Sequence, residues 1–218
     1  MIEKFKWMFE WYKIKTEYGE QIIYEPEVFA EAFANNSYQN QIRKLLETKK
    51  YDVFLDVGAA WGHFALIGAK LCKRVIAFEP QPFRYGFLLY NCRHLFNVDC
   101  RYEFVTCKGE APTMGALEEM CESRHDKPYN VKTITLDDIE IKPNEKVLVK
   151  LDVEGSELKV LSGCPNLIAN TNVDWIIDVH HHQGVTSKDV KDFFKNKNNV
   201  DLGTDHICSV LEFIGVKN

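Results

Sequence analysis

Two groups of acidic residues in this chain have the spacing of a ligand-binding site in an α/β sheet. In the first group, an apolar run over 53–57 carries Asp56 and leads into Gly58 and Gly62, and a second apolar run ends directly before Glu79. Ligands of open α/β sheets bind at the carboxyl ends of the strands. Glycines there let a ligand approach the backbone, and an acidic side chain can accept hydrogen bonds from both hydroxyls of a ribose. The first group therefore predicts a nucleoside site.

The spacing of the glycines indicates the kind of nucleoside. A dinucleotide fingerprint, G-x-G-x-x-G, needs its middle glycine so that the pyrophosphate can approach, and Ala60 stands at that position. The charge of Asp56 also suits a cationic group better than a phosphate. The pattern D-x-G-x-x-x-G with a later acid resembles motifs I and II of the class I S-adenosylmethionine-dependent methyltransferases. The resemblance implies S-adenosyl-L-methionine as cofactor, held by Asp56, Gly58, Ala59, Gly62, Glu79 and Pro80.

The second group follows an apolar run over 147–151 that ends in Asp152 and Glu154. Residues two apart point to the same side of an extended segment, so both carboxylates are expected at the tip of this strand. Asp152 is predicted near the methionine end of the cofactor or near the acceptor. His180 ends the apolar run over 173–179. An alcohol that receives a methyl group is helped by a base, and histidine has a suitable pKa.

The catalytic prediction is therefore His180 as base, with Asp152 or Glu154 orienting or replacing it. Two other interpretations stay open. The three consecutive histidines that begin at His180 also fit a solvated loop. A divalent metal on Asp152, Glu154 and His180 would activate an oxygen as well, but sites for hard cations usually gather more oxygens. No metal is predicted.

Five segments together resemble the successive motifs of the FkbM-like methyltransferase family in order and spacing: FLDVGAAWGHFAL, VIAFEPQPFRYGFLLYN, TITLDDI, VLVKLDVEGSELKVLSG and WIIDVHH. The resemblance covers about residues 52–182, and the family favours Asn where this chain has Ala60. It implies transfer of a methyl group to a hydroxyl oxygen of a small molecule or a sugar or glycan. It also implies a doubly wound, mostly parallel seven-stranded sheet, closed by an antiparallel hairpin formed by strands at 200–202 and 207–214.

The segments outside this match carry less information. A third strand is predicted over 101–106, and in a nucleoside-binding sheet its end meets the adenine, which makes Thr106 and Cys107 further candidates for cofactor contacts. A helix is predicted at 114–123. Residues 107–130 and 1–50 are expected to shape the acceptor pocket.

The N-terminal segment is predicted to be a helical extension over 1–50, followed by a methyltransferase domain over 51–218. Residues 1–15 carry aromatic groups on two helical stripes. Such a helix packs on the sheet domain or on a sister subunit, covers the acceptor pocket as a lid, or lies on a membrane surface. A small hairpin is expected around Gly19, and a helix over 27–49 that is broken near 35–37.

Composition limits the classes of partner and compartment. The net charge of −5 without a block of like charges argues against a nucleic-acid partner. Seven cysteines without a C-x-x-C pair favour free thiols in a reducing compartment. No membrane span is visible, so we expect a cytoplasmic protein. The rival functions are a nicotinamide-dependent enzyme on the same strand pattern, a cofactor-binding protein without catalysis and, last, a nucleic-acid methyltransferase.

Overall fold

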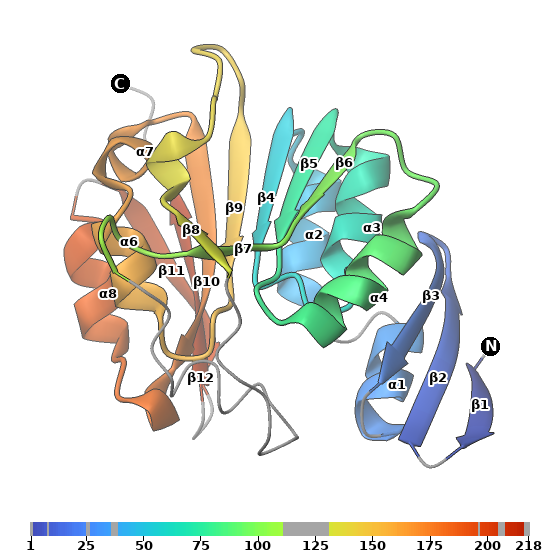
Figure 1. Ribbon diagram of the computed structural model, residues 1–218. Helices are drawn as coiled ribbons and strands as arrows, with labels where there is room; N and C mark the ends of the chain where they lie inside the picture. Colours follow the sequence, from blue (N-terminus) through green and yellow to red (C-terminus); the bar gives the residue numbers. More distant parts are fainter. Residues whose placement is uncertain are drawn as a thin grey trace.

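A seven-stranded sheet forms the centre of the molecule (Figure 1). The computed structural model describes residues 2–7, 9–24, 27–35, 39–110, 131–195, 197–204 and 208–215. The strands follow the order β11-β12-β10-β9-β4-β5-β6, and β12 runs antiparallel to both of its neighbours while the others are parallel. The predicted fold and its closing hairpin are confirmed. Their bounds are β4 (Val53–Val57), β5 (Arg74–Phe78), β6 (Val98–Arg101), β9 (Val147–Leu151), β10 (Val173–His180), β11 (Asn198–Thr204) and β12 (Cys208–Ile214).

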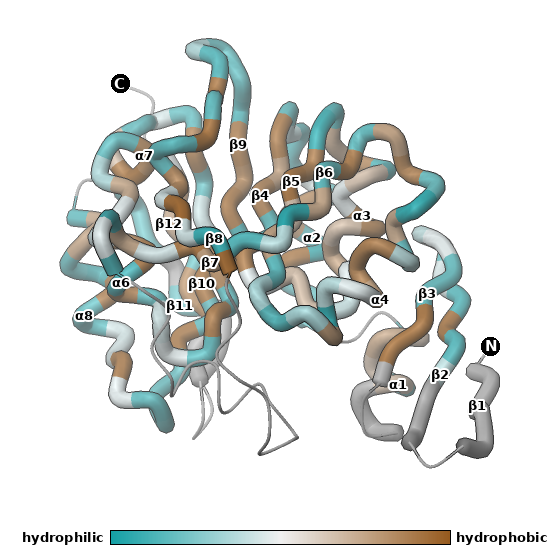
Figure 2. The backbone as a smooth tube through the Cα atoms, in the orientation of Figure 1, coloured by the Kyte–Doolittle hydropathy of each residue, from teal (hydrophilic) through white to brown (hydrophobic). Residues whose placement is uncertain are grey.

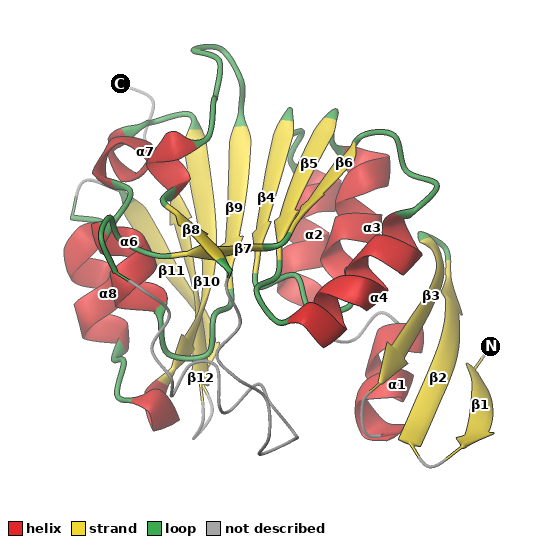
Figure 3. Ribbon diagram, viewed as in Figure 1, coloured by secondary structure: helices red, strands yellow, loops and turns green. Residues whose placement is uncertain are grey.

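Helices cover both faces of the sheet (Figure 3). One layer holds α2 (Asn40–Thr48), α3 (His63–Leu71) and α4 (Pro82–Cys92), and the other holds α6 (Glu157–Ser162), α7 (Pro165–Ala169) and α8 (Ser187–Phe193). Because side chains alternate along a strand, Val53 and Leu55 pack against the α6–α8 layer while Phe54 packs against the other. The central strands β4 and β9 are accordingly buried at every position and apolar at all but one position each (Figure 2). Within the described ranges, no helix is long and apolar enough to cross a membrane.

The edge of the sheet differs from the prediction. Strand β6 ends at Arg101, and residues Glu103–Val105 form β7, which pairs in parallel with β8 (Lys132–Ile134) outside the main sheet. The strand predicted over 101–106 is therefore present only at 103–105, and its predicted place in the main sheet is wrong, because β6 takes that place. An edge strand packs only in part, and β6 contributes just Val98 and Cys100 to the core, so it lacks the apolar run of a central strand. The helix predicted at 114–123 lies outside the described residues.

The N-terminal segment is largely a small antiparallel sheet instead of a helix. It consists of β1 (Ile2–Trp7), β2 (Phe9–Thr16) and β3 (Gly19–Tyr24). The predicted helix over 1–15 is wrong, because the alternation of buried Tyr12 and Ile14 with Lys13 and Lys15 has the period of a strand. A homo-oligomer through the helices of this segment stays a prediction.

The predicted hairpin around Gly19 and the broken helix over 27–49 are confirmed. Strands β2 and β3 form the hairpin, and α1 (Glu27–Ala34) and α2 are the two pieces of the broken helix. The division of the chain at residue 50 stays a prediction.

Asn91 of α4 fastens the N-terminal sheet to the main domain. Its side chain accepts a hydrogen bond from Ile22 N at 2.8 Å and donates to Ile22 O at 2.9 Å and to Trp61 O at 2.7 Å. Beside it, Tyr12, Ile23 and Trp61 share a small apolar core. Because Asn91 is buried and uses its side-chain oxygen and amide nitrogen here, the extension has a defined position next to the turn that follows β4.

Candidate functional site

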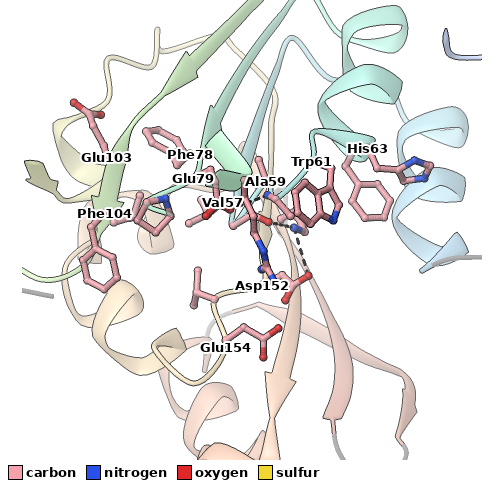
Figure 4. A pocket seen from close by; sticks show the side chains of 18 of the residues that line it. Val57, Ala59, Trp61, His63, Phe78, Glu79, Glu103, Phe104, Asp152 and Glu154 are labelled. Carbon is pink, nitrogen blue, oxygen red and sulfur yellow. Dashed lines mark hydrogen bonds and ion pairs between the residues drawn. The ribbon is translucent and has the colours of Figure 1, made fainter. Parts of the chain in front are cut away.

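A pocket of about 240 Å³ opens where β4, β5 and β9 end (Figure 4). Its wall is built from the turn at 58–61, the tip of β5 at 78–80, the segment 103–105 and the tip of β9 at 152–154. Because β4 lies between β5 and β9 in the sheet, these tips are neighbours. Six of the predicted site residues line the pocket: Gly58, Ala59, Glu79, Pro80, Asp152 and Glu154. Five do not: Asp56, Gly62, Thr106, Cys107 and His180.

Glu79 lies at the floor of the pocket with only 2% of its surface exposed. Its carboxylate accepts backbone N–H groups from Ala60 at 2.8 Å and from Gln81 at 2.9 Å, one on each oxygen. Burial raises the pKa of Glu79, and Arg84 and the two N–H groups oppose this. Each carboxylate oxygen can accept a second hydrogen bond, so Glu79 is fixed in place and still able to bind two hydroxyls.

The turn after β4 owes its shape to close packing. At Gly58, φ is +79°, and a Cβ atom would stand 1.8 Å from the carbonyl oxygen of Asp152. Gly62, with φ +86°, packs against Leu88 of α4 instead of the pocket. Ala60 has φ +47°, a left-handed conformation that asparagine tolerates better than alanine. The departure from the family pattern at this position is therefore a departure in backbone preference.

The residues after β6 that line the pocket come before the predicted ones in the sequence. Thr106 has no exposed surface, donates its N–H to Ile134 O at 2.9 Å and lies with Cys107 against Gly163. Phe104 and Val105 line the pocket instead. Thr106 and Cys107 thus do not line this pocket, because the short pairing of β7 with β8 turns them toward α6, and their contact with the adenine stays a prediction.

Asp56 is fully buried and faces a lysine that the sequence interpretation overlooked. The Nζ atom of Lys150 lies 3.2 Å from Asp56 Oδ1, 2.7 Å from Gly58 O and 3.5 Å from Asp152 Oδ2. Burial raises the pKa of Asp56 and Lys150 opposes it. Asp56 therefore lies behind the turn. The signal was present: VFLDV and VLVKL are both buried strands, and each carries one charged residue, of opposite sign, in fourth place.

His180 lies behind the acidic end of the pocket and is buried. Its Nδ1 is 2.6 Å from Glu157 Oε1, and its Nε2 is 3.3 Å from Glu154 Oε2 and 3.6 Å from Asp152 Oδ1. Burial alone would lower the pKa of His180, but the hydrogen bond to Glu157 and the charges of Asp152 and Glu154 raise it to about 9. The imidazole is therefore a cation at neutral pH, and a cation is unsuited to accept a proton.

A side chain from the N-terminal segment, that of Gln39, also contacts Asp152 and Asp178. Gln39 Nε2 donates to Asp178 Oδ2 at 2.8 Å and lies 3.5 Å from Asp152 Oδ2. One ligand atom from each of Asp152, Asp178 and His180 lies within 4.8 Å of the others. The metal alternative named Glu154 in place of Asp178. The cationic and N–H groups of Lys150, His180 and Gln39 already lie on these carboxylates, so they supply the positive partners that a cation would provide.

A second histidine, His63, lines the pocket and differs from His180 in its charge. His63 and Phe33 line the pocket with their rings 4.7 Å apart, and His63 Nδ1 is 2.8 Å from Gln21 Nε2. Burial, with a smaller effect of Lys150, lowers the pKa of His63 to about 3. His63 is therefore neutral. Because Gln21 and Phe33 come from the N-terminal segment, that segment forms part of the site.

The groups in the pocket match the parts of S-adenosylmethionine. Phe104 and Val105 offer an apolar wall for a base, Glu79 offers acceptors for a ribose, and Asp152 and Glu154 offer negative charge for a sulfonium.

Comparison with known proteins agrees with this arrangement. The family model of the methyltransferase FkbM domain matches residues 56–200. The hexuronic acid methyltransferase AglP of Haloferax volcanii is 34% identical over 163 residues, which is 70% of this chain and 65% of AglP. The chain thus spans slightly less than two thirds of that relative.

Solved structures resemble the fold at low sequence identity. The N-methyltransferase NodS of Bradyrhizobium japonicum WM9 aligns with a TM-score of 0.53 and 13% identity, covering 84% of this chain and 97% of NodS. The ribosomal protein L11 methylase of Lactobacillus delbrueckii subsp. bulgaricus aligns with a TM-score of 0.50 and 13% identity, covering 80% and 77%. The fold is that of these methyltransferases, and by the match over 56–200 the chain belongs to the FkbM methyltransferase domain family.

Proposed function

We propose that this protein is an S-adenosylmethionine-dependent methyltransferase that methylates a hydroxyl oxygen of a sugar or another small molecule. The proposal rests on one observation: a single pocket contains both the predicted nucleoside site and the predicted pair of carboxylates. The turn at 58–61 and Glu79 form one end, and the carboxylates of Asp152 and Glu154 form the other. A cofactor end and an acceptor end in one cavity are what a group transfer between two molecules requires.

At the cofactor end, the chain binds and orients. Glu79 accepts the ribose hydroxyls, and the turn at 58–61 supplies the backbone against which the methionine part lies. When bound, S-adenosylmethionine supplies an electrophilic methyl group on a sulfonium sulfur. Asp56 supports this end only through Lys150, because its carboxylate is buried behind the turn.

At the acceptor end, the Asp152 carboxylate accepts the proton of the acceptor hydroxyl while the oxygen of that hydroxyl is methylated. The pKa of about 9 assigns His180 another task, which is to hold Asp152 and Glu154 through its Nε2 while Glu157 fixes its Nδ1. Lys150 and Gln39 hold the same carboxylate from its other oxygen. Three side chains, those of His180, Lys150 and Gln39, thus orient the Asp152 carboxylate.

The charge of the acceptor end favours a hydroxyl over a carboxylate as the methylated group. Asp152, Glu154 and Asp178 gather there, and the cations Lys150 and His180 also serve the buried acids Asp56 and Glu157. A carboxylate brought to this end would be repelled by like charges, whereas a neutral hydroxyl would be accepted. AglP is a hexuronic acid methyltransferase, and a hexuronic acid offers both kinds of oxygen.

The experiment uses S-adenosylmethionine with a labelled methyl group and two acceptors, a neutral methyl glycoside and the corresponding hexuronic acid. We expect label in the product and its retention under mild alkali, which cleaves a methyl ester and leaves a methyl ether. Loss of the label under alkali would refute the hydroxyl assignment. Titration with S-adenosylhomocysteine, with NAD as control, tests the cofactor. Binding of NAD without binding of S-adenosylhomocysteine would refute the proposed function.

A further inference from the structure

Lys150 is a charged residue inside the central sheet, with 3% of its surface exposed. It lies on β9 directly beside Asp56 of β4, in a register that pairs the two residues. A lone ammonium group in such a place would be very costly, so it must be met by acceptors. The question is whether Lys150 only neutralises Asp56 or also does work for the pocket.

The contacts of the ammonium reach beyond Asp56. An ammonium has three N–H donors, and three acceptors surround this one: Gly58 O at 2.7 Å, Asp56 Oδ1 at 3.2 Å and Asp152 Oδ2 at 3.5 Å. The shortest contact is to the turn and not to the buried carboxylate. Lys150 therefore touches β4, the turn after it and the acceptor-end carboxylate with one atom.

The backbone around Lys150 brings the same parts together. Asp152 N donates to Val57 O at 3.1 Å, and the α-carbon of Gly58 lies so close to the Asp152 carbonyl that a side chain there would collide with it. The turn and the tip of β9 are thus in direct backbone contact and form one structural unit. The Lys150 ammonium lies between the Gly58 carbonyl on one side of this unit and the Asp152 carboxylate on the other.

We propose that Lys150 is a positioning residue that fixes the cofactor turn and the Asp152 carboxylate relative to each other. The inference rests on the proposed function, because it assigns the turn to the cofactor and Asp152 to the acceptor. Asp56, in this arrangement, is the buried counter-charge that makes the lysine possible. Removing both charges should then preserve the fold but loosen the pocket.

The test compares Lys150→Met, Asp56→Asn and the double variant carrying both. Replacement of a buried ion pair by neutral groups of similar size is often tolerated, whereas removal of one partner is not. We expect Lys150→Met to lower the urea midpoint strongly and the double variant to regain most of it. Although its stability recovers, the double variant should bind S-adenosylhomocysteine at least tenfold more weakly than the wild type does, as measured by isothermal titration.

A matched control removes a second lysine that pairs with a buried acid of the same sheet. Lys49 lies 3.6 Å from Asp174 and 3.0 Å from Glu212, and none of these three lines the pocket. Lys49→Met should lower the urea midpoint and leave the affinity for S-adenosylhomocysteine within twofold of the wild type.

The outcomes separate the two proposals. If the wild type binds S-adenosylhomocysteine and the double variant binds it equally well, Lys150 only neutralises Asp56, and the positioning role is refuted while the proposed function stands. If the stable wild type does not bind S-adenosylhomocysteine, the proposed function fails first and the positioning role falls with it. Weak binding by a double variant that has regained stability supports both.

Discussion

The two ends of the pocket are built in different ways. At the cofactor end, a short stretch of chain supplies the turn at 58–61, and Glu79 is held by backbone N–H groups from that turn and its own neighbour. At the acceptor end, side chains from three separate parts of the chain meet: Gln39, Asp152 and the β10 pair Asp178 and His180. The first end depends on backbone geometry, and the second depends on a balance of charges.

The difference is clearest in the two histidines. His63 is neutral because burial lowers its pKa to about 3, while His180 is cationic because its acidic partners raise its pKa to about 9. Both are buried. Burial alone therefore does not decide the charge of a histidine in this molecule: it keeps His63 neutral, whereas the acids beside His180 outweigh it. A pocket with a neutral wall at one end and an ionic cluster at the other can bind an uncharged ring system beside a cation.

The largest effect expected is on catalysis at the acceptor end. Asp152→Asn removes the proposed base and keeps the size of the side chain, so the rate of methyl transfer should fall at least about a hundredfold, the usual contribution of a general base. Affinity for S-adenosylhomocysteine should change by less than about threefold, since that ligand lacks the sulfonium charge. Steady-state kinetics and isothermal titration measure the two. Retention of the wild-type rate would refute the assignment of Asp152 as the base at the acceptor end.

The contributions of His180 and His63 to the free energy of unfolding should change with pH in opposite directions. The pKa of His180 is raised on folding from the ordinary 6.5 to about 9. Its stabilisation is full below pH 6.5 and disappears as the pH rises through 9, a loss of up to about 3 kcal/mol. The pKa of His63 is lowered on folding to about 3, so its contribution is full above pH 6.5 and is lost as the pH falls toward 3.

The measurement is urea unfolding of the wild type, His180→Gln and His63→Gln from pH 4 to pH 9.5. The difference between wild type and His180→Gln should shrink on the alkaline side, and the difference between wild type and His63→Gln should shrink on the acid side. Parallel curves for wild type and His180→Gln above pH 6.5 would show that the acidic cluster does not hold His180 as a cation.

The cofactor end should respond to Glu79→Ala through binding. Loss of two acceptors for the ribose hydroxyls, and of the support for the N–H groups of Ala60 and Gln81, should weaken S-adenosylhomocysteine binding by about 1–3 kcal/mol. Isothermal titration measures it. The exposed Glu110, which lies outside the pocket lining, offers a matched control whose replacement by Ala should leave the affinity unchanged. Unchanged affinity in Glu79→Ala would place the cofactor elsewhere.

The smallest effect concerns the backbone of the turn. Ala60 adopts φ +47°, which costs alanine more than asparagine. Ala60→Asn should therefore stabilise the protein by about 0.5–1 kcal/mol, measured as an increase in the urea midpoint. A decrease would mean that the asparagine side chain meets an obstacle in the turn, and that the alanine is needed for space.

The sequence alone located the turn at 58–61 and Glu79, and it predicted the doubly wound, mostly parallel sheet. The apolar runs, the glycines of the turn and Glu79 lie within the single stretch 53–79, but Asp56, Gly62, Thr106 and Cys107 do not line the pocket. The helix predicted over 1–15 failed because residues that fit helical stripes there also fit the alternation of a strand, and the pairing of β1, β2 and β3 decided between the two.

Only the tertiary structure decided which charges meet. The sequence predicted carboxylates at the tip of β9 and a histidine at the tip of β10, but the protonation of His180 depends on Glu157, which is 23 residues away and fully buried. The same holds for Lys150 with Asp56 and for Gln39 with Asp178, since these partners are brought together by strand order and by docking of the N-terminal segment. The free energy of a buried charge depends on its neighbours in space, and sequence separation does not encode them.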